Sequence, residues 1–174
     1  IHERLVGSEM CIRDSSMSDQ LTKQRSDLCN LLRRAYLSCL PLTEGTNKTL
    51  TYTSRVSCAY MPLDSPKMME ALLNLIVNAL DAVSDNGSVQ IILTKSNEQF
   101  IVSIIDDGCG IAPKQLLTIF HPFTTTKPDG TGLGLPVAKR IIEGHGGHIR
   151  VSSAPNQGAT FTFLLPCSFS SDKK

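Results

Sequence analysis

The sequence contains no tryptophan, and its few cysteines are not arranged for metal binding. None of the six cysteines forms a CxxC pair, and no His/Cys cluster has the spacing of a zinc site. A membrane helix needs an apolar run of about 18 residues, and no run in this sequence is that long. We therefore expect no membrane contact by this segment, although a longer parent protein could carry an anchor. No secretion signal is visible either, so we expect reduced thiols and a cytoplasmic chain.

Neither sign of charge predominates. The sequence has 17 basic and 16 acidic residues, which gives a net charge of +1. Because no strongly basic stretch is present, we expect no nucleic-acid partner. With 174 residues, of which 41% are hydrophobic, the chain is long enough for one domain with a sizeable core.

Both ends of the chain look unlike folded protein. Residues 1–16 contain the string VGSEMCIRDS, which resembles the translated read-through of a sequencing adapter, and Met17 is a natural start. An ordinary polar N-terminal tail is the alternative. We expect 1–16 to be a non-native or disordered tail, and the polar residues 168–174 to be a disordered tail.

Hydrophobic periodicity divides the rest of the chain into helices and strands. It predicts helices over 21–40, 65–83, 113–119 and 131–143. Asp64 or Ser65 can cap the second helix, with Pro66 in its first turn. Alternating segments predict strands over 49–57, 88–95, 99–106, 147–153 and 159–165, of which the second and third form a hairpin. The expected fold is a two-layer α/β sandwich, in which helices cover one face of a mixed, mostly antiparallel sheet.

Two asparagines stand out in the helix over 65–83. Asn74 and Asn78 are four residues apart and share one helix face, while apolar residues fill the other faces. A buried amide in such a helix costs free energy unless it is hydrogen-bonded or bound to a ligand. Taken alone, the pair would be structural. Asp81, three residues further on, could reach the same side or be an ordinary surface residue.

Two glycine-containing strings follow in the second half of the chain. Asp106 ends an apolar strand, and Gly108 and Gly110 let the backbone turn closely after it, although this string alone could be a calcium loop or a simple turn. GTGLGL over 130–135 opens a helix, whose free backbone N–H groups suit phosphate oxygens. It is not a dinucleotide fingerprint, because a loop rich in Thr and Pro precedes it rather than a strand.

In this order, the motifs resemble those of the ATP-binding domain shared by gyrase, heat-shock chaperones, sensor histidine kinases and mismatch-repair ATPases, the Bergerat fold. The resemblance covers about residues 40–167 and is nearer to the histidine kinases. LLNLIVNALDA is similar to their N box, IIDDGCGIAP to the G1 box, IFHPFTTTK to the F box and DGTGLGLPVAKRIIEGHGGHI to the G2 box. QGATFTFLLP resembles the closing strand, and the FTTTK form is most similar to kinases of the nitrogen-regulation type.

The resemblance implies roles for the matching residues. It assigns adenine recognition to Asp106, with Ile111 packed beside the base. It assigns a magnesium ion to the amide oxygen of Asn78, with Asn74 beside it. The other implied contacts to the nucleotide are those of Gly108, Gly110, Lys127, Thr131, Gly132, Leu133, Gly134 and Thr162.

The F box implies a mobile lid over the nucleotide. Phe120 and Phe123 would lie at its root, although such residues are commonly part of the core. Lys127 would meet the terminal phosphates, or be a solvated loop lysine. Thr162 would support a water network around the adenine, or be an ordinary half-buried strand residue.

Several positions depart from the family pattern. Asn74 stands where the water-activating members carry a glutamate. An amide cannot act as a general base, so we expect ATP to be held for transfer rather than hydrolysed efficiently. Asp81 stands where some kinases place a basic phosphate ligand. Asp107 and Cys109 lie at variable positions, His121 replaces an acid, and none of the three is given a role.

These features predict the ATP-binding catalytic domain of a two-component sensor histidine kinase, with ATP and Mg²⁺ as ligands. The γ-phosphoryl would pass to a histidine on the helical dimerisation domain of the parent kinase, which would serve a response regulator. Only His2 precedes the N box, without the Asn-Pro of an H box, so the acceptor is expected to be missing. Residues 17–40 would be a helical connector, the tail of the dimerisation region, and 41–167 the catalytic domain.

Two other classes of function share this fold. A gyrase-like ATPase is disfavoured by Asn74 and by the absence of the further domains of such motors. A nucleotide-binding switch, or an anti-sigma-like serine kinase module, also lacks an H box and is the main alternative.

Overall fold

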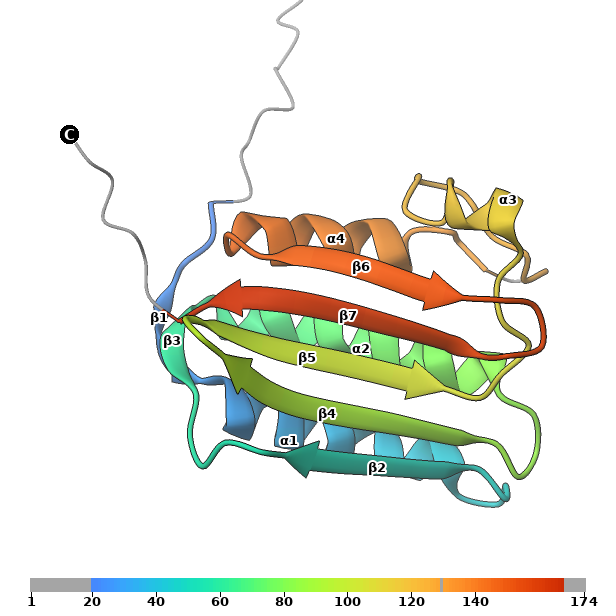
Figure 1. The fold of residues 1–174 in the computed structure, drawn as a ribbon, viewed down its shortest axis with the longest axis horizontal. Coiled ribbons are helices and arrows are strands. Elements are labelled where there is room, and N and C mark those ends of the chain that lie inside the picture. Colours follow the sequence, from blue (N-terminus) through green and yellow to red (C-terminus); the bar gives the residue numbers. More distant parts are fainter. Residues whose placement is uncertain (1–19, 129, 168–174) are drawn as a thin grey trace, which may run out of the picture.

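A five-stranded sheet with helices on one face forms the body of the protein (Figure 1). The computed structural model describes residues 20–128 and 130–167. The expected tails at 1–16 and 168–174, the start of the expected connector, and Asp129 at the end of the expected lid loop lie outside these residues. Among the described residues, no helix is both long and apolar enough to cross a membrane.

The sheet has the strand order β2-β4-β5-β7-β6. Its strands are β2 (Thr49–Ser54), β4 (Ser88–Ser96), β5 (Gln99–Asp106), β7 (Ala159–Pro166) and β6 (His148–Ser153). β2 pairs in parallel with β4, and all other neighbours are antiparallel. The predicted mixed, mostly antiparallel sheet and its β4–β5 hairpin are therefore confirmed.

Helices lie on one face of this sheet, as predicted (Figure 1). They are α1 (Leu28–Cys39), α2 (Ser65–Ala82) and α4 (Gly134–Gly144), and the shorter elements are the 3₁₀ turn η1 (Leu40–Thr43) and α3 (Pro113–Leu116). α2 begins as the sequence predicts, because the Asp64 side chain accepts a hydrogen bond from the Lys67 N–H at 3.1 Å. Pro66 occupies its first turn, where no N–H is needed.

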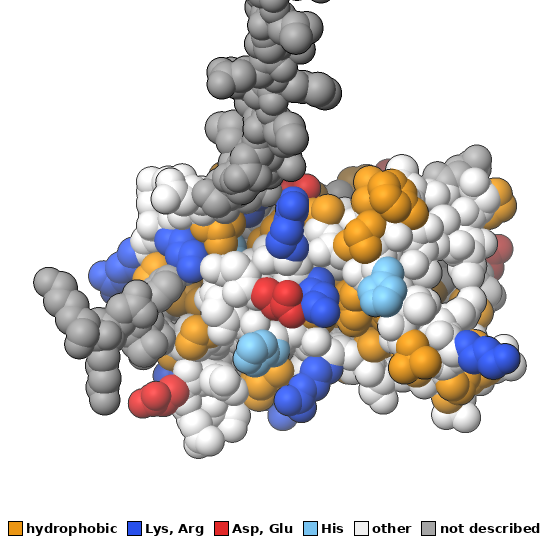
Figure 2. Space-filling model, turned by 90° about the horizontal axis from the view of Figure 1, so that it is seen from above, with side chains coloured by type: hydrophobic (Ala, Val, Ile, Leu, Met, Phe, Trp, Pro, Cys, Tyr) orange, Lys and Arg blue, Asp and Glu red, His pale blue; other side chains and the backbone are white. Residues whose placement is uncertain are grey.

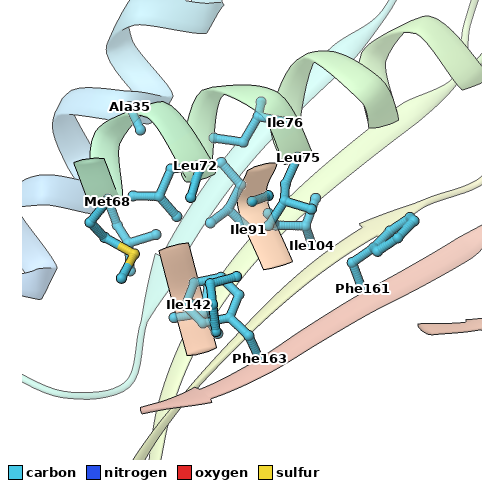
Figure 3. Packing of buried hydrophobic residues seen from close by; sticks show 14 of the residues in the cluster. Ala35, Met68, Leu72, Leu75, Ile76, Ile91, Ile104, Ile142, Phe161 and Phe163 are labelled. Atoms are coloured by element: carbon cyan, nitrogen blue, oxygen red, sulfur yellow. The ribbon is translucent and has the colours of Figure 1, made fainter. Parts of the chain in front are cut away.

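The core lies between α2 and the sheet (Figure 3). Side chains three and four residues apart on α2 lie on one face of the helix. They pack against alternate side chains of the strands, which lie on one face of the sheet. These side chains are fully buried, and they include Met68, Leu72, Leu75, Ile76, Ile91, Ile104, Phe161 and Phe163. Because this packing fixes the rotation of α2, it also fixes the direction in which the polar side of the helix faces.

The predicted helix over 21–40 begins too early. Residues Gln24–Asp27 form a short strand, β1, which pairs antiparallel with β3 (Tyr60–Leu63), and neither strand was predicted. The helix starts only after Asp27, whose Oδ1 accepts hydrogen bonds from the N–H groups of Cys29 at 3.0 Å and Ala59 at 2.9 Å. α1 then buries Leu28 and Leu32 in the same core as the sheet.

The helix predicted over 131–143 begins three residues later, at Gly134. Gly132 has a φ of 66°, outside the helical region, so the chain cannot be helical before it. The helix predicted over 113–119 is shorter, and the strand predicted over 49–57 ends at Ser54. These differences concern boundaries, which local periodicity defines poorly.

The face seen in Figure 2 carries charged side chains of both signs. They are scattered between uncharged and apolar side chains rather than gathered into one patch. This face therefore has no broad field of one sign that would attract a highly charged polymer.

Candidate nucleotide-binding site

One cavity of about 920 Å³ brings the four sequence motifs together. It lies between the end of α2, the loop after β5, the loop over 124–132 and the start of α4. The predicted residues that line it are Asn74, Asn78, Asp81, Asp106, Gly110, Ile111, Lys127, Gly130, Thr131, Gly132 and Gly134. Three predicted contact residues, Gly108, Leu133 and Thr162, do not line it.

α2 presents its polar stripe to the cavity. Asn74 and Asn78 are half-buried and line it, whereas Leu75 and Ala79, one position further along, are buried in the core. The start of α4 lies directly against this stripe, since a Cβ on Gly134 would be 3.6 Å from Cγ of Asn74. The amide groups are therefore held at the point where two helices meet.

Asp106 is a buried carboxylic acid residue in the wall of the cavity, and it is only 5% exposed. Its Oδ1 accepts hydrogen bonds from the N–H of Gly108 at 2.9 Å and of Ala159 at 3.2 Å. Burial raises the pKa of this carboxyl above its usual value, and the two N–H groups oppose that shift in part. No described residue is bonded to Oδ2, which leaves this oxygen for a donor on a ligand.

Glycines let the loop after β5 pass close to its neighbours. A Cβ on Gly108 would collide with the carbonyl of Ala82 at the end of α2. Gly110 has a φ of 70°, and a Cβ there would meet the carbonyl oxygen of Ala154. Ile111 is tied down beyond the turn, because its N–H donates to Ser153 Oγ at 2.9 Å. Gly108 therefore packs against the end of α2 and does not line the cavity, and its contact with the nucleotide stays a prediction.

The G2 motif forms a tight turn before α4. A Cβ on Gly132 would lie 2.6 Å from the carbonyl carbon of Phe123, so this glycine allows two loop segments to touch. The Leu133 N–H approaches Thr131 Oγ1 at 3.4 Å. The turn brings Gly134 and Leu135 at the start of α4 to the wall of the cavity, and a helix N-terminus at this place favours an anionic ligand. Leu133 is 39% exposed and does not line the cavity, and its contact with the nucleotide stays a prediction.

The two phenylalanines of the F box differ. Phe120 packs edge-on against Phe161 of the core, with 6.4 Å between ring centroids. Phe123 is 78% exposed and has a φ of 64°, a region that non-glycine residues seldom adopt. Lys127, further along the loop, donates to Asp81 Oδ2 at 2.7 Å and to Asn78 Oδ1 at 3.4 Å. The loop is thus anchored at Phe120 and reaches across the cavity to α2.

Thr162 lies away from the cavity, and its role beside the adenine stays a prediction. Its hydroxyl lies 3.2 Å from that of Ser103 on the face of the sheet without helices. The β7 side chains that line the cavity are Ala159 and Phe161, which have the opposite orientation. Strand side chains alternate between the two faces, so an error of one residue changes the face.

Further lining residues were not identified from the sequence. Cys109, to which no role was given, lines the cavity, whereas Asp107 instead accepts hydrogen bonds from the backbone N–H and hydroxyl of Ser88 at 2.8 and 2.7 Å. The other unpredicted lining residues are mostly apolar or threonine: Leu73, Val77, Ala82, Gln115, Ile119, Thr124, Thr125, Thr126, Pro128, Leu135, Pro136, Ala159 and Phe161. Apolar periodicity marks such residues as core, and does not separate the wall of a cavity from the interior.

The known proteins that this chain resembles include several histidine kinases. Sensor histidine kinase ZraS of Salmonella typhimurium is 36% identical over 166 residues, which are 86% of this chain and 36% of that protein. The signal transduction histidine-protein kinase AtoS of Escherichia coli is 41% identical over 127 residues, 71% of this chain and 21% of that protein. The catalytic domain of the histidine kinase ThkA has a TM-score of 0.77 at 29% identity, covering 84% of this chain and 96% of that domain.

The family model that matches residues 63–168 is described as histidine kinase-, DNA gyrase B-, and HSP90-like ATPase. It covers more than half of the chain, and the chain belongs to this family. The similar proteins named above are all histidine kinases, and the similar domain is a catalytic one, as the sequence motifs predict. The chain spans about a third or less of the length of these curated relatives.

Proposed function

We propose that this chain is the ATP-binding catalytic domain of a two-component sensor histidine kinase. It binds ATP with Mg²⁺ and presents the γ-phosphoryl to a histidine on a separate helical domain of the parent kinase. The observation that supports this best is the meeting of Asn78, Asp106 and the start of α4 in one cavity. These three features have the chemistry for a metal ion, an exocyclic amine and a phosphate chain.

The residues present fit a magnesium ion. Asn78 Oδ1 and the Asp81 carboxylate are oxygen donors, and both already contact one cationic group, the Lys127 ammonium. Within the described part of the chain, no group of three His, Cys, Asp or Glu side chains is arranged to hold a metal. Asn78 would therefore hold the ion together with phosphate oxygens and water, as Mg²⁺ prefers. When bound, the ion neutralises charge on the phosphates.

The remaining residues bind and orient the nucleotide. Asp106 Oδ2 accepts a hydrogen bond from the adenine amine, while Ile111 packs beside the base. The turn over 130–134 donates backbone N–H groups to the phosphates. Asn74 contacts the phosphate end without deprotonating water, which keeps the nucleotide for transfer rather than hydrolysis.

The acceptor histidine lies outside this domain. His145 is buried, and both ring nitrogens are bonded, Nε2 to the Asp64 N–H at 2.9 Å and Nδ1 to the Ile141 carbonyl at 2.7 Å. It follows the last residue of α4, about 16 Å from the start of that helix at about 1.5 Å per residue. His145 therefore cannot receive a phosphoryl group held at Gly134.

Partners and location follow from this role. The direct partner is the helical dimerisation domain, and residues up to about 40 form the connection to it. A response regulator then takes the phosphoryl group, and ThkA, a similar kinase, has been crystallised with its response regulator TrrA. The domain acts in the cytoplasm, whether or not the parent protein is anchored in a membrane.

A transfer assay in trans tests the proposal. The chain is mixed with the histidine-bearing helical domain of its parent kinase and γ-labelled ATP. We expect acid-labile, base-stable label on the helical domain and none on this chain, because proximity supplies much of the rate. Acid-stable label on a serine of a partner, or phosphohistidine on this chain alone, would contradict the proposal.

A further inference from the structure

One charged side chain joins the lid to helix α2 across the cavity. The Lys127 ammonium lies 2.7 Å from Asp81 Oδ2 and 3.4 Å from Asn78 Oδ1. Lys127 and Asp81 are 46 residues apart in the sequence. The contact therefore does not stabilise a local turn but holds two separate segments together, one of them the helix that carries the metal ligand.

We propose that Lys127 is an internal counter-cation of the nucleotide site. In the nucleotide-free chain its ammonium occupies the cation position at Asn78 and Asp81 and straps the lid to α2. It leaves that position when the metal–nucleotide complex binds, and it then becomes available to the phosphates. This inference rests on the proposed function, since it takes Asn78 as the magnesium ligand.

The lid turn is built to present this lysine. The Lys127 N–H donates to Thr125 Oγ1 at 3.0 Å, and the Gly130 N–H donates to the Lys127 carbonyl at 3.1 Å. A Cβ on Gly130 would collide with Thr125 Oγ1 and lie 3.1 Å from Lys127 Cβ. The absence of a side chain at position 130 thus lets the turn close, and the backbone of Lys127 is fixed on both sides.

The two groups that Lys127 contacts attract a cation together. Asn78 and Asp81 lie three residues apart on one helix, so their oxygens face the same space. An ammonium group satisfies both, but it cannot share that space with a divalent ion, because like charges at such a distance repel strongly. Metal binding at Asn78 and release of Lys127 are therefore linked.

The strap is weak enough to open. The side chains of Lys127 and Asp81 are 42% and 51% exposed, so water and salt screen their attraction. An exposed pair of this kind changes an equilibrium by less than about fivefold. The lid is thereby held in place in the free chain and is released without a large loss of affinity for the nucleotide.

Titration of Mn²⁺ alone into the nucleotide-free chain tests the exchange directly, with free Mn²⁺ followed by electron paramagnetic resonance. Lys127→Met should bind Mn²⁺ about two- to fivefold more tightly than the wild type, because the competing ammonium is gone. Lys127→Arg should stay close to the wild type. Lys114→Met is the matched control, since it removes the same charge from exposed α3 outside the cavity and should have a smaller effect.

Nitrogen-15 NMR of the lysine side chains supplies a second readout. The Lys127 ammonium signal should be protected from solvent exchange in the free chain and lose that protection in Asp81→Asn. Equal Mn²⁺ affinities for the wild type and Lys127→Met, or a Lys127 signal that Asp81→Asn does not change, would overturn the proposal. Neither measurement contains ATP. Failure of the counter-cation proposal is therefore distinct from failure of the proposed function, which would appear as a wild-type chain that does not bind ATP.

Discussion

Replacing Asp106 by Asn separates recognition of the base from stability of the fold. The amide oxygen of the substituted side chain can still accept from the N–H groups of Gly108 and Ala159, which now bond to Oδ1 of Asp106. The second oxygen becomes an NH₂ group, which meets the adenine amine donor to donor. Losing a hydrogen bond to a charged acceptor costs about 1.5–3 kcal/mol, so the affinity for ATP should fall about 10- to 150-fold.

The same substitution should not destabilise the free chain. Burial raises the pKa of Asp106, so the folded state binds this proton more tightly than the unfolded state does. The favourable contribution of the group is therefore full below its unfolded pKa and is lost as the pH rises through the folded pKa. At neutral pH the buried charge opposes folding, and a neutral amide that keeps both hydrogen bonds should melt at the same or a higher temperature.

Calorimetry with ATP and with inosine triphosphate measures the effect on recognition, and thermal melting measures the effect on the fold. Inosine has an acceptor in place of the amine, so Asp106→Asn should lose much less affinity for it. Asp107→Asn is the control, because that neighbouring carboxylate bonds to Ser88 outside the cavity. Equal losses for both nucleotides together with a lower melting temperature would refute the reasoning and make Asp106 purely structural.

Three further substitutions test other parts of the account. Burial lowers the pKa of His145, so the folded chain favours the neutral ring, and the free energy of unfolding should fall as the pH drops below about 6.5, by up to about 1.4 kcal/mol per pH unit. Urea unfolding of His145→Gln should show a weaker pH dependence, and an unchanged dependence would contradict this role of His145. Asn74→Glu should raise phosphate release from ATP above a slow wild-type rate, and a wild-type rate as fast as that of the variant would show that Asn74 does not limit hydrolysis. Thr162→Val should leave the affinity for ATP unchanged in calorimetry, whereas a severalfold loss would place Thr162 back in the site.

The sequence predicts best what local chemistry determines. The Asp64 cap and Pro66 define the start of α2, and two alternating segments with a short polar turn define the β4–β5 hairpin. The positions of Asn78 and Asp106 follow from these elements, because one is set by helix periodicity and the other by the end of a strand. Four motifs in a fixed order then bring distant segments into one cavity.

The features that were missed depend on contacts between distant residues. β1 is short and polar, and it is a strand only because β3, more than 30 residues away, offers it a partner. Thr162 lies on the half-buried face of β7, opposite the buried side chains of Phe161 and Phe163, and the role that the resemblance implied for Thr162 did not take this alternation into account. The contact of Lys127 with Asp81 depends on the path of the lid, which no periodic pattern describes.

Calorimetric titration of ATP, with and without Mg²⁺, tests the central claim most directly. The wild-type chain should bind ATP more tightly with Mg²⁺, and Asn78→Ala should abolish that dependence because the amide oxygen that holds the ion is gone. Asn30→Ala, on the exposed side of α1, should behave like the wild type. A wild-type chain that does not bind ATP, or an Asn78→Ala variant with the same response to Mg²⁺ as the wild type, would contradict the assignment of this cavity.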